Sequence, residues 1–293
     1  MQVHRSHRME RLVDVLAEVV RAPVGDALEP ETILIQSKGM ERWLSNQLAL
    51  RLGVFANARF PFPRGFIDEV FDAVVPQPEP NPVSYGREVL TFGILTLLPR
   101  LLGDPAFGPL YGYLEQDDQA VKRFQLAERI AHVFDQYLVY RPRLLLKWEK
   151  GQGADWQAKL WRALRQHLGG QHFATRALRF FQEWSPLLIA PGALPKRVSV
   201  VGVSALPPIY LKILDRISER CDVQLFLLSP SPEYFAQLKS LREMVRRSSV
   251  GRGAQAELAF DDREFADLQG NPLLASLGRT GREFQFTLER DTL

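Results

Sequence analysis

The stretch ILIQSKGMERWL, residues 33–44, contains an apolar strand that leads directly into a helix. Its first three residues are apolar and two of them are β-branched, which favours a buried strand. Ser37 is a good helix N-cap and Glu41 falls in the first turn, so the pattern predicts a helix over about residues 39–52. A strand followed at once by a helix is the repeating unit of α/β folds.

The strand–helix pattern recurs further along the chain. An extended segment at residues 57–62 precedes a helix that contains Phe66. The β-branched run at residues 198–203 is typical of a parallel strand buried on both faces. The prolines at 207–208 then open another helix, since proline is favoured at the first helical position, and a further strand is predicted over residues 221–228.

The middle of the chain differs, because its pattern is almost wholly helical from Arg87 to about Ser185. A proline-rich linker at residues 76–82 separates this part from the first α/β segment. We therefore predict an α/β domain from residues 1–80 plus 190–293 and a helical insertion domain from residues 81–189. Within the α/β domain, the polar segment 248–270 is expected to be mobile.

The composition of the 293 residues is that of an ordinary globular chain, with 46% hydrophobic and 24% charged residues. The single cysteine, Cys221, excludes an internal disulfide framework and an all-cysteine zinc site. His4 and His7 lack the carboxylate or thiol neighbours that a metal site needs. The longest apolar stretch, residues 89–102, is well short of the roughly 20 residues that span a bilayer, so a cytoplasmic protein without a membrane partner is expected.

The net charge of +3 is unevenly distributed along the chain. Residues 121–185 contain twelve Lys and Arg against five acids, a net +7, whereas the remainder has 25 against 29 and a net −4. Four of the five tryptophans also lie in this basic segment, at spacings that suit the buried faces of helices. The excess charge is compatible with a path for DNA, a docking face for an acidic partner, or a solvated face.

A nucleotide site can be tested against the same strand–helix turn. A phosphate loop needs the pattern Gly-x-x-x-x-Gly-Lys-Ser/Thr, but residues 36–43 contain one glycine, preceded by Lys38 and followed by no Ser or Thr. The strand at 198–203 leads into GVSALPP, residues 202–208, without the carboxylates that hold Mg²⁺ in phosphate-loop NTPases. The sequence therefore predicts no ATP hydrolysis by this chain.

Five blocks of sequence together carry a family resemblance: residues 33–44, AN at 56–57 with FPFP at 60–63, FDQYLVYRP at 134–142, VSALPPIYL at 203–211 and GNPLLASLGR at 270–279. In order and in content they resemble the N-terminal part of the RecC family, the gamma subunits of exonuclease V in bacterial RecBCD helicase–nucleases. Members of that family are several times longer than this chain.

The resemblance implies a P-loop-NTPase-like parallel sheet in the superfamily 1 helicase 1A position, with an all-helical 1B-like insertion and eroded ATPase motifs. It implies a scaffold without a catalytic site or cofactor of its own, because ATP and Mg²⁺ are used by partner subunits. The partners it implies are RecB-like and RecD-like helicase and nuclease subunits, together with single-stranded and duplex-end DNA. In the family this region channels the 3′-ending strand and scans it for Chi, in double-strand break repair by homologous recombination.

The resemblance also implies a DNA-reading face, made of residues that match the family's Chi-reading positions: Gln36, Lys38, Arg42, Phe62, Asp68, His132, Val133 and Asp135. Their chemistry is compatible with that use. A glutamine amide can bond base edges, Lys and Arg can bind phosphate, and a phenylalanine ring can stack on a base.

Two further hypotheses belong to other classes of protein. The chain could be a divergent nucleotide hydrolase that uses the turn at Lys38 and Gly39, or a partner-docking module without DNA contact that uses the basic helical segment.

Overall fold

A computed structural model describes residues 1–26, 29–77, 85–115, 121–187, 189–231, 274 and 277–291. The chain forms two compact units. The sheet unit comprises Met1–Ile67 and Pro191–Leu293, and the helical unit comprises Asp68–Ala190. The predicted mobile segment 248–270 lies outside the described residues.

The sheet unit is built on five parallel strands in the order β1-β5-β4-β2-β3. This confirms the predicted α/β class with a parallel sheet. The strands are β1 (Gln2–Ser6), β2 (Glu31–Leu34), β3 (Ala58–Arg59), β4 (Arg197–Val201) and β5 (Asp222–Leu228). The helices are α1 (Met9–Arg21), α2 (Lys38–Leu52), α10 (Pro208–Ile217) and α14 (Arg279–Asp291), while α3 (Pro63–Val74) begins in this unit and continues into the helical unit.

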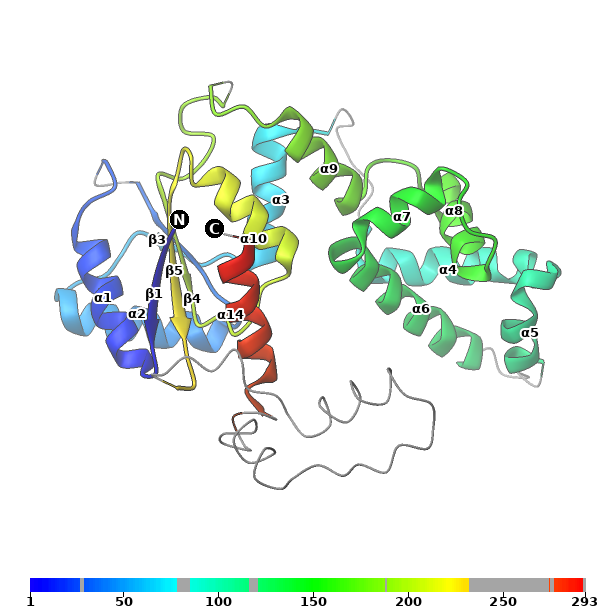
Figure 1. The fold of residues 1–293 in the computed structure, drawn as a ribbon, viewed down its shortest axis with the longest axis horizontal. Helices are drawn as coiled ribbons and strands as arrows, with labels where there is room; N and C mark the ends of the chain where they lie inside the picture. Colours follow the sequence, from blue (N-terminus) through cyan, green and yellow to red (C-terminus); the bar gives the residue numbers. More distant parts are fainter. Residues whose placement is uncertain are drawn as a thin grey trace, which may run out of the picture. The chain divides into compact units, whose positions relative to one another are not determined.

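The core of the sheet unit lies between the sheet and the pair α1 and α2, which cover one face, while α10 and α14 lie on the other (Figure 1). Leu12 and Leu16 of α1 and Leu48 of α2 pack on Ile33 and Phe226 of the sheet, and all five are fully buried. Burial of side chains of this size contributes roughly 1.5–3 kcal/mol each.

The edge strand β1 is absent from the predicted elements. It pairs in parallel with β5, from Gln2 opposite Gln224 to Ser6 opposite Leu228, and its side chains are mostly polar because one side of the strand faces solvent. His4 is a packing residue of this edge: its ring stacks on Phe226 with centroids 4.8 Å apart, and its Nε2 lies 2.7 Å from Oε1 of Gln224.

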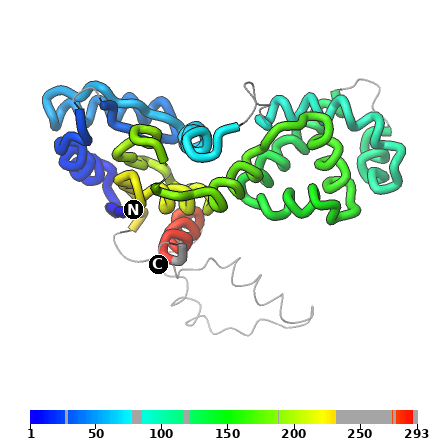
Figure 2. Tube along the Cα trace, turned by 90° about the horizontal axis from the view of Figure 1, so that it is seen from above, coloured from blue at the N-terminus to red at the C-terminus, as the bar shows by residue number. Residues whose placement is uncertain are grey.

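The helical unit, shown in cyan to green in Figure 2, is built from short antiparallel and crossing helices around aromatic side chains. Trp148 and Trp161 are buried, and Phe134 meets Trp161 edge to face with centroids 5.4 Å apart. Trp156 and Trp184 are partly buried. The helices are α4 (Arg87–Leu101), the 3-10 helix η1 (Pro105–Phe107), α5 (Gly108–Leu114), α6 (Val121–Tyr140), α7 (Pro142–Glu149), α8 (Trp156–Leu168) and α9 (Phe173–Glu183).

Helices α5 and α7 lie within the segment predicted to be almost wholly helical, although each is too short for its own helical period to stand out. Among the described residues, no single helix is long and apolar enough to cross a membrane. One pair bent by 120°, Arg87–Leu101 with Pro105–Leu114, meets the length and composition criteria when taken together.

Candidate nucleic-acid interface

The turn from β2 to α2 places the first candidate residues at the carboxyl edge of the sheet. Ser37 has an extended backbone and caps α2, since its Oγ accepts a hydrogen bond from the backbone N–H of Met40 at 3.2 Å. The predicted N-cap is thereby confirmed. The cap fixes the direction in which the chain leaves the strand, and so presents the exposed Gln36 at the strand's end.

Gln36 is anchored to the neighbouring strand's exit. Its Nε2 donates to the backbone carbonyl of Ala205, which follows β4, at 3.3 Å. The two strands are adjacent in the sheet, with Leu34 opposite Val200. The other half of the Gln36 amide, Oε1, makes no hydrogen bond within the part of the chain that the structure describes. The anchored amide therefore presents an acceptor to solvent.

A close approach between α2 and the end of β4 holds these two turns together. Gly202 follows β4 with φ of +66°, which a glycine adopts without strain. A Cβ at this position would come within 2.6 Å of Cε of Met40. A side chain here would therefore strain the backbone and displace the side chain of Met40 at the start of α2.

Phe62 reaches the same edge from the third strand segment. The backbone N–H of Ile35 donates to the carbonyl of Pro61 at 3.2 Å, so the residues that follow β2 and β3 lie side by side. The carbonyl of Phe62 accepts from the N–H of Phe66 at 3.0 Å, at the start of α3. The ring of Phe62 is 44% exposed, which leaves an aromatic face available for stacking.

Lys38 and Arg42 lie one turn apart on α2 and differ in their electrostatics. Nζ of Lys38 is 2.6 Å from Oε2 of Glu41, an exposed pair of the kind that contributes little to stability. Arg42 is also exposed, but its guanidinium makes no ion pair or hydrogen bond among the described residues. Arg42 therefore carries the uncompensated positive charge of this edge.

The other four candidates belong to the helical unit. His132, Val133 and Asp135 lie on α6, where His132 is opposite the buried face formed by residues such as Ile130 and Phe134, and Val133 and Asp135 flank it on either side. His132 and Val133 are exposed and Asp135 is partly exposed. The side chains of His132 and Asp135 make no hydrogen bond or ion pair within the described ranges, so their polar atoms are available to a ligand.

Asp68 differs from the rest because it has an internal partner. Its Oδ1 lies 3.9 Å from Nη1 of Arg176, and Asp72 lies closer, with 2.5 Å between its Oδ1 and Nη2 of Arg176. The Arg176 side chain is buried and lies over the ring of Phe71, with Cζ 5.2 Å from the ring centroid. Asp68 therefore helps to balance a buried cation, a role that its position in the sequence does not indicate.

A buried polar network in the helical unit was also not predicted. Nε2 of His172 lies 2.5 Å from Oε1 of Glu149, which also accepts from Nε1 of Trp161 at 2.9 Å and faces Nε of Arg165 at 3.3 Å. Burial lowers the pKa of His172 below its ordinary value and outweighs the raising effect of Glu149. Burial acts to raise the pKa of Glu149, but its bonds to His172 and Trp161 and the charge of Arg165 lower it overall.

The network consequently joins a neutral imidazole to an ionised carboxylate. Nδ1 of His172 accepts from the backbone N–H of Thr175, so the proton of the neutral ring resides on Nε2 and is donated to Glu149. Among the residues that the structure describes, no three His, Cys, Asp or Glu side chains come together as a group that could hold a metal ion.

Comparisons with known proteins agree with the block resemblance. Residues 1–293 match the family model described as RecC, N-terminal domain. The RecBCD enzyme subunit RecC of Escherichia coli (strain K12) is 35% identical to this chain over 321 aligned residues, and the alignment covers 98% of this chain and 28% of the relative. The RecC subunit of Haemophilus influenzae is 30% identical, with 99% and 30% covered, and that of Mycolicibacterium smegmatis is 30% identical, with 100% and 26% covered.

The chain spans less than a third of the length of these three relatives, whose alignments cover 28%, 30% and 26% of them. The family model, in contrast, matches the chain from its first residue to its last. The chain therefore belongs to the family of RecC N-terminal domains.

Proposed function

We propose that this chain is a non-catalytic, DNA-binding part of a RecBCD-type helicase–nuclease that acts in double-strand break repair by homologous recombination. In this proposal the chain guides the 3′-ending single strand and scans it for Chi. RecB-like and RecD-like subunits supply the helicase and nuclease activities and use the ATP and Mg²⁺.

The observation that carries the proposal is the set of side chains at the carboxyl edge of the sheet. An anchored amide at Gln36, an uncompensated cation at Arg42 and an exposed ring at Phe62 lie on adjoining turns. These groups provide the three kinds of contact used on single strands, namely hydrogen bonds to base edges, attraction of phosphate and stacking. Ligands of open parallel sheets bind at this edge.

The strand order supports the proposal that the sheet unit is helicase-like with an eroded nucleotide site. In an active helicase the phosphate loop and the acidic strand end share one Mg²⁺, so they must be neighbours. Here β2 and β4 are adjacent and parallel, and Gln36 of one exit bonds Ala205 of the other. At those positions this chain has the side-chain amide of Gln36 and the backbone carbonyl of Ala205, which form a hydrogen bond with each other.

The candidates on α6 form a second set of proposed contacts, within the helical unit. Asp135 can accept a hydrogen bond from the amino group of cytosine, and Val133 offers an apolar contact to a base. Asp68 stays in the proposal as a DNA-facing position, because its side chain is 41% exposed, and it also stabilises Arg176.

The test is equilibrium binding of the 293-residue chain to a fluorescent single-stranded oligonucleotide over a range of salt concentrations. We expect affinity to fall steeply as salt rises, because phosphate binding releases counterions. Phe62→Ala should weaken binding roughly 5- to 150-fold through loss of one stacking contact, whereas Leu50→Ala, at an exposed apolar residue of α2, should leave it unchanged.

Absence of salt-sensitive binding to any single strand would contradict the proposal. ATP turnover with Mg²⁺ that is lost in Lys38→Ala would instead support the hydrolase hypothesis. The Lys38 ammonium lies beside Glu41, so the proposal predicts no such turnover.

A further inference from the structure

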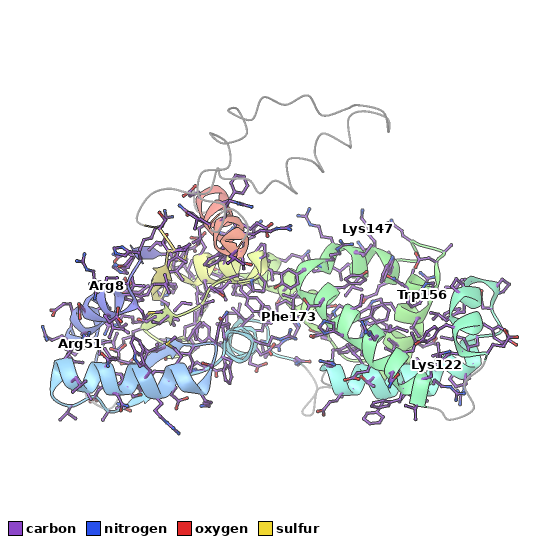
Figure 3. The ribbon with its side chains drawn as sticks, turned by 90° about the horizontal axis from the view of Figure 1, so that it is seen from below. Arg8, Arg51, Lys122, Lys147, Trp156 and Phe173 are labelled. Carbon is purple, nitrogen blue, oxygen red and sulfur yellow. The ribbon has the colours of Figure 1, made fainter. Side chains whose placement is uncertain are left out.

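Helix α7 presents an exposed face made only of positive charges. The exposed side chains of Arg143 and Lys147, and of Lys150 at the C-cap, are spaced by four and three residues, which places them on one side of the helix over about 10 Å. Leu145 and Trp148 are buried on the opposite side. Figure 3 labels Lys147, whose side chain projects from the ribbon of the helical unit. We refer to Arg143, Lys147 and Lys150 as the α7 basic face.

Internal contacts account for other cations of the basic segment but not for these three. Five of the twelve are held within the helical unit by carboxylates or carbonyl oxygens: Lys159 by Asp104, Arg162 by the carbonyls of Trp148, Gln152 and Gly153, Arg165 by Glu149, Arg176 by Asp72, and Arg179 by Glu183. Within the described residues, the side chains of the α7 basic face make no ion pair and no hydrogen bond.

The only acid of α7 is turned away from this face. Glu149 is directed inward, where His172, Trp161 and Arg165 bind its carboxylate. The carboxylate of Glu149 therefore binds groups inside the helical unit and does not pair with Lys147 or Lys150. The outer face consequently keeps its full positive charge.

Helix stability does not explain Arg143. It lies in the first turn of α7, which contains no acid, and the N-terminal end of a helix dipole disfavours a cation. Lys147 and Lys150 lie near the other end, where a cation is favoured. Arg143 therefore opposes the helix dipole and has no partner among the residues that the structure describes, which points to an external anion.

The basic face is held in place by the surrounding structure. The guanidinium of Arg162 donates to the carbonyls of Trp148, Gln152 and Gly153, which lie where α7 ends and the next loop begins. Trp148 packs edge to face against Phe134 of α6 with centroids 6.3 Å apart. A cationic face on a fixed helix loses little conformational freedom when it binds.

We propose that the α7 basic face binds the phosphate backbone of duplex DNA. A single strand is a poorer match, because single-strand sites combine cations with exposed aromatic rings, and the aromatic residue of α7, Trp148, is buried. Duplex DNA carries about one charge per 1.7 Å of axis, so a face about 10 Å long meets several phosphates at once. The inference rests on the proposed function, to which it adds a second, base-independent contact.

The experiment measures binding of a blunt duplex and of a single strand to the 293-residue chain as salt is varied. The test variant is R143Q/K147Q/K150Q. The matched control is R21Q/K196Q/R216Q, which removes three equally charged residues of the sheet unit that already have carboxylate partners, Glu18, Glu29 and Glu219. Circular dichroism melting checks that both variants fold, and R143K/K147R/K150R keeps the charge.

We expect the test variant to bind the duplex at least tenfold more weakly at low salt. The slope of log affinity against log salt should be shallower by roughly two to three, because about 0.9 counterion is released for each phosphate contact. The control and the charge-conserving variant should bind the duplex as the unmodified chain does.

Unchanged duplex binding by the test variant would overturn the inference. A test variant that still binds the duplex but no longer binds a polyglutamate peptide, used as a probe for an acidic partner, would overturn it as well. In either case, continued binding of the single strand by the unmodified chain would leave the proposed function standing. Failure of the unmodified chain to bind either DNA would contradict the proposed function itself.

Discussion

Gln36 illustrates how one side chain can serve structure and recognition together. Its amide nitrogen holds the exit of β4 through Ala205, and its amide oxygen is left for a ligand. A glutamine at a strand end is often only a backbone anchor, and the hydrogen bond to Ala205 is an anchor of that kind. The structure therefore shows a structural role for the amide nitrogen of Gln36, and whether the amide oxygen binds DNA is to be tested.

Gln36→Ala separates the two uses. Loss of one exposed hydrogen bond should lower the free energy of unfolding by about 1 kcal/mol or less. If the oxygen also reads bases, the variant should lose the chain's preference among oligonucleotides of different sequence while it keeps overall affinity. Competition binding and thermal melting measure the two effects. A loss of stability with an unaltered preference would show that Gln36 is an anchor only.

His172 makes the stability of the helical unit depend on pH. Its pKa in the folded protein lies below the ordinary value of 6.5, so the unfolded chain takes up a proton first as pH falls. Stability is therefore full above about pH 6.5 and declines below it. Glu149, whose folded pKa is also lowered, adds a further loss below its ordinary value of 4.5.

His172→Gln should remove the loss of stability between about pH 7 and pH 5, although it should lower the stability at pH 7.5. Urea unfolding followed by tryptophan fluorescence measures this, since Trp161 is part of the network. His132→Gln is the matched control, because His132 is exposed and makes no hydrogen bond or ion pair in the described part of the chain. An unchanged pH dependence in His172→Gln would exclude the buried imidazole as its source.

At the scale of elements, the start of α2 determines the geometry of the proposed reading face. Ser37 caps the helix, whose first turn begins with Lys38, and Arg42 follows one turn later. The cap, the apolar strand before it and Glu41 in the first turn are all local features. For that reason they could be predicted from the sequence.

Ser37→Ala should lower the free energy of unfolding by about 1 kcal/mol, because one backbone N–H of α2 loses its partner. Ser37→Asp keeps a capping oxygen and should restore most of this loss. Denaturant titrations of the three proteins provide the comparison. Equal stability of all three would mean that the cap does not hold the start of α2.

Elements whose identity depends on distant partners could not be predicted. Strand β1 is short and polar, and it becomes a strand only because it pairs with β5. That partner lies more than 200 residues away along the chain, so the local sequence does not indicate the pairing. Similarly, Asp68 and Arg176 are 108 positions apart in the printed sequence, and nothing in either segment indicates their contact. The buried strands β2 and β4, in contrast, are marked by their own β-branched residues.

At the scale of the whole molecule, the charge distribution gains a structural meaning. The net +7 of residues 121–185 belongs to one segment of the helical unit, because residues 68–190 together contain 14 Lys and Arg against 14 acids. Part of the positive charge is used internally by residues such as Arg165 and Arg176. The α7 basic face, like Arg129 on α6, remains exposed without a partner in the described residues. Composition alone is compatible with a charged partner or a solvated face, and only coordinates separate the cations that fold the unit from those available to bind.

For the candidate site too, the sequence indicates which residues could bind, and the structure shows which of them lie close together. Local chemistry indicates which residues could bind DNA, and the family resemblance selects eight positions among them. The structure brings Gln36 and Phe62 to one edge of the sheet through the contact of Ile35 with Pro61, which no periodicity reveals. Of the three residues on α6, His132 and Asp135 are three positions apart and so share one side of the helix, as their spacing implies, whereas Val133 lies on another side.

The central claim is that the carboxyl edge of the sheet contacts single-stranded DNA. The most direct measurement places a photoreactive phenylalanine analogue at position 62 and, as a control, at position 50, because both side chains are exposed and belong to the sheet unit. The account predicts that irradiation joins the oligonucleotide to position 62 and not to position 50. Equal joining at both positions, or none at position 62 under conditions where the chain binds the strand, would contradict it.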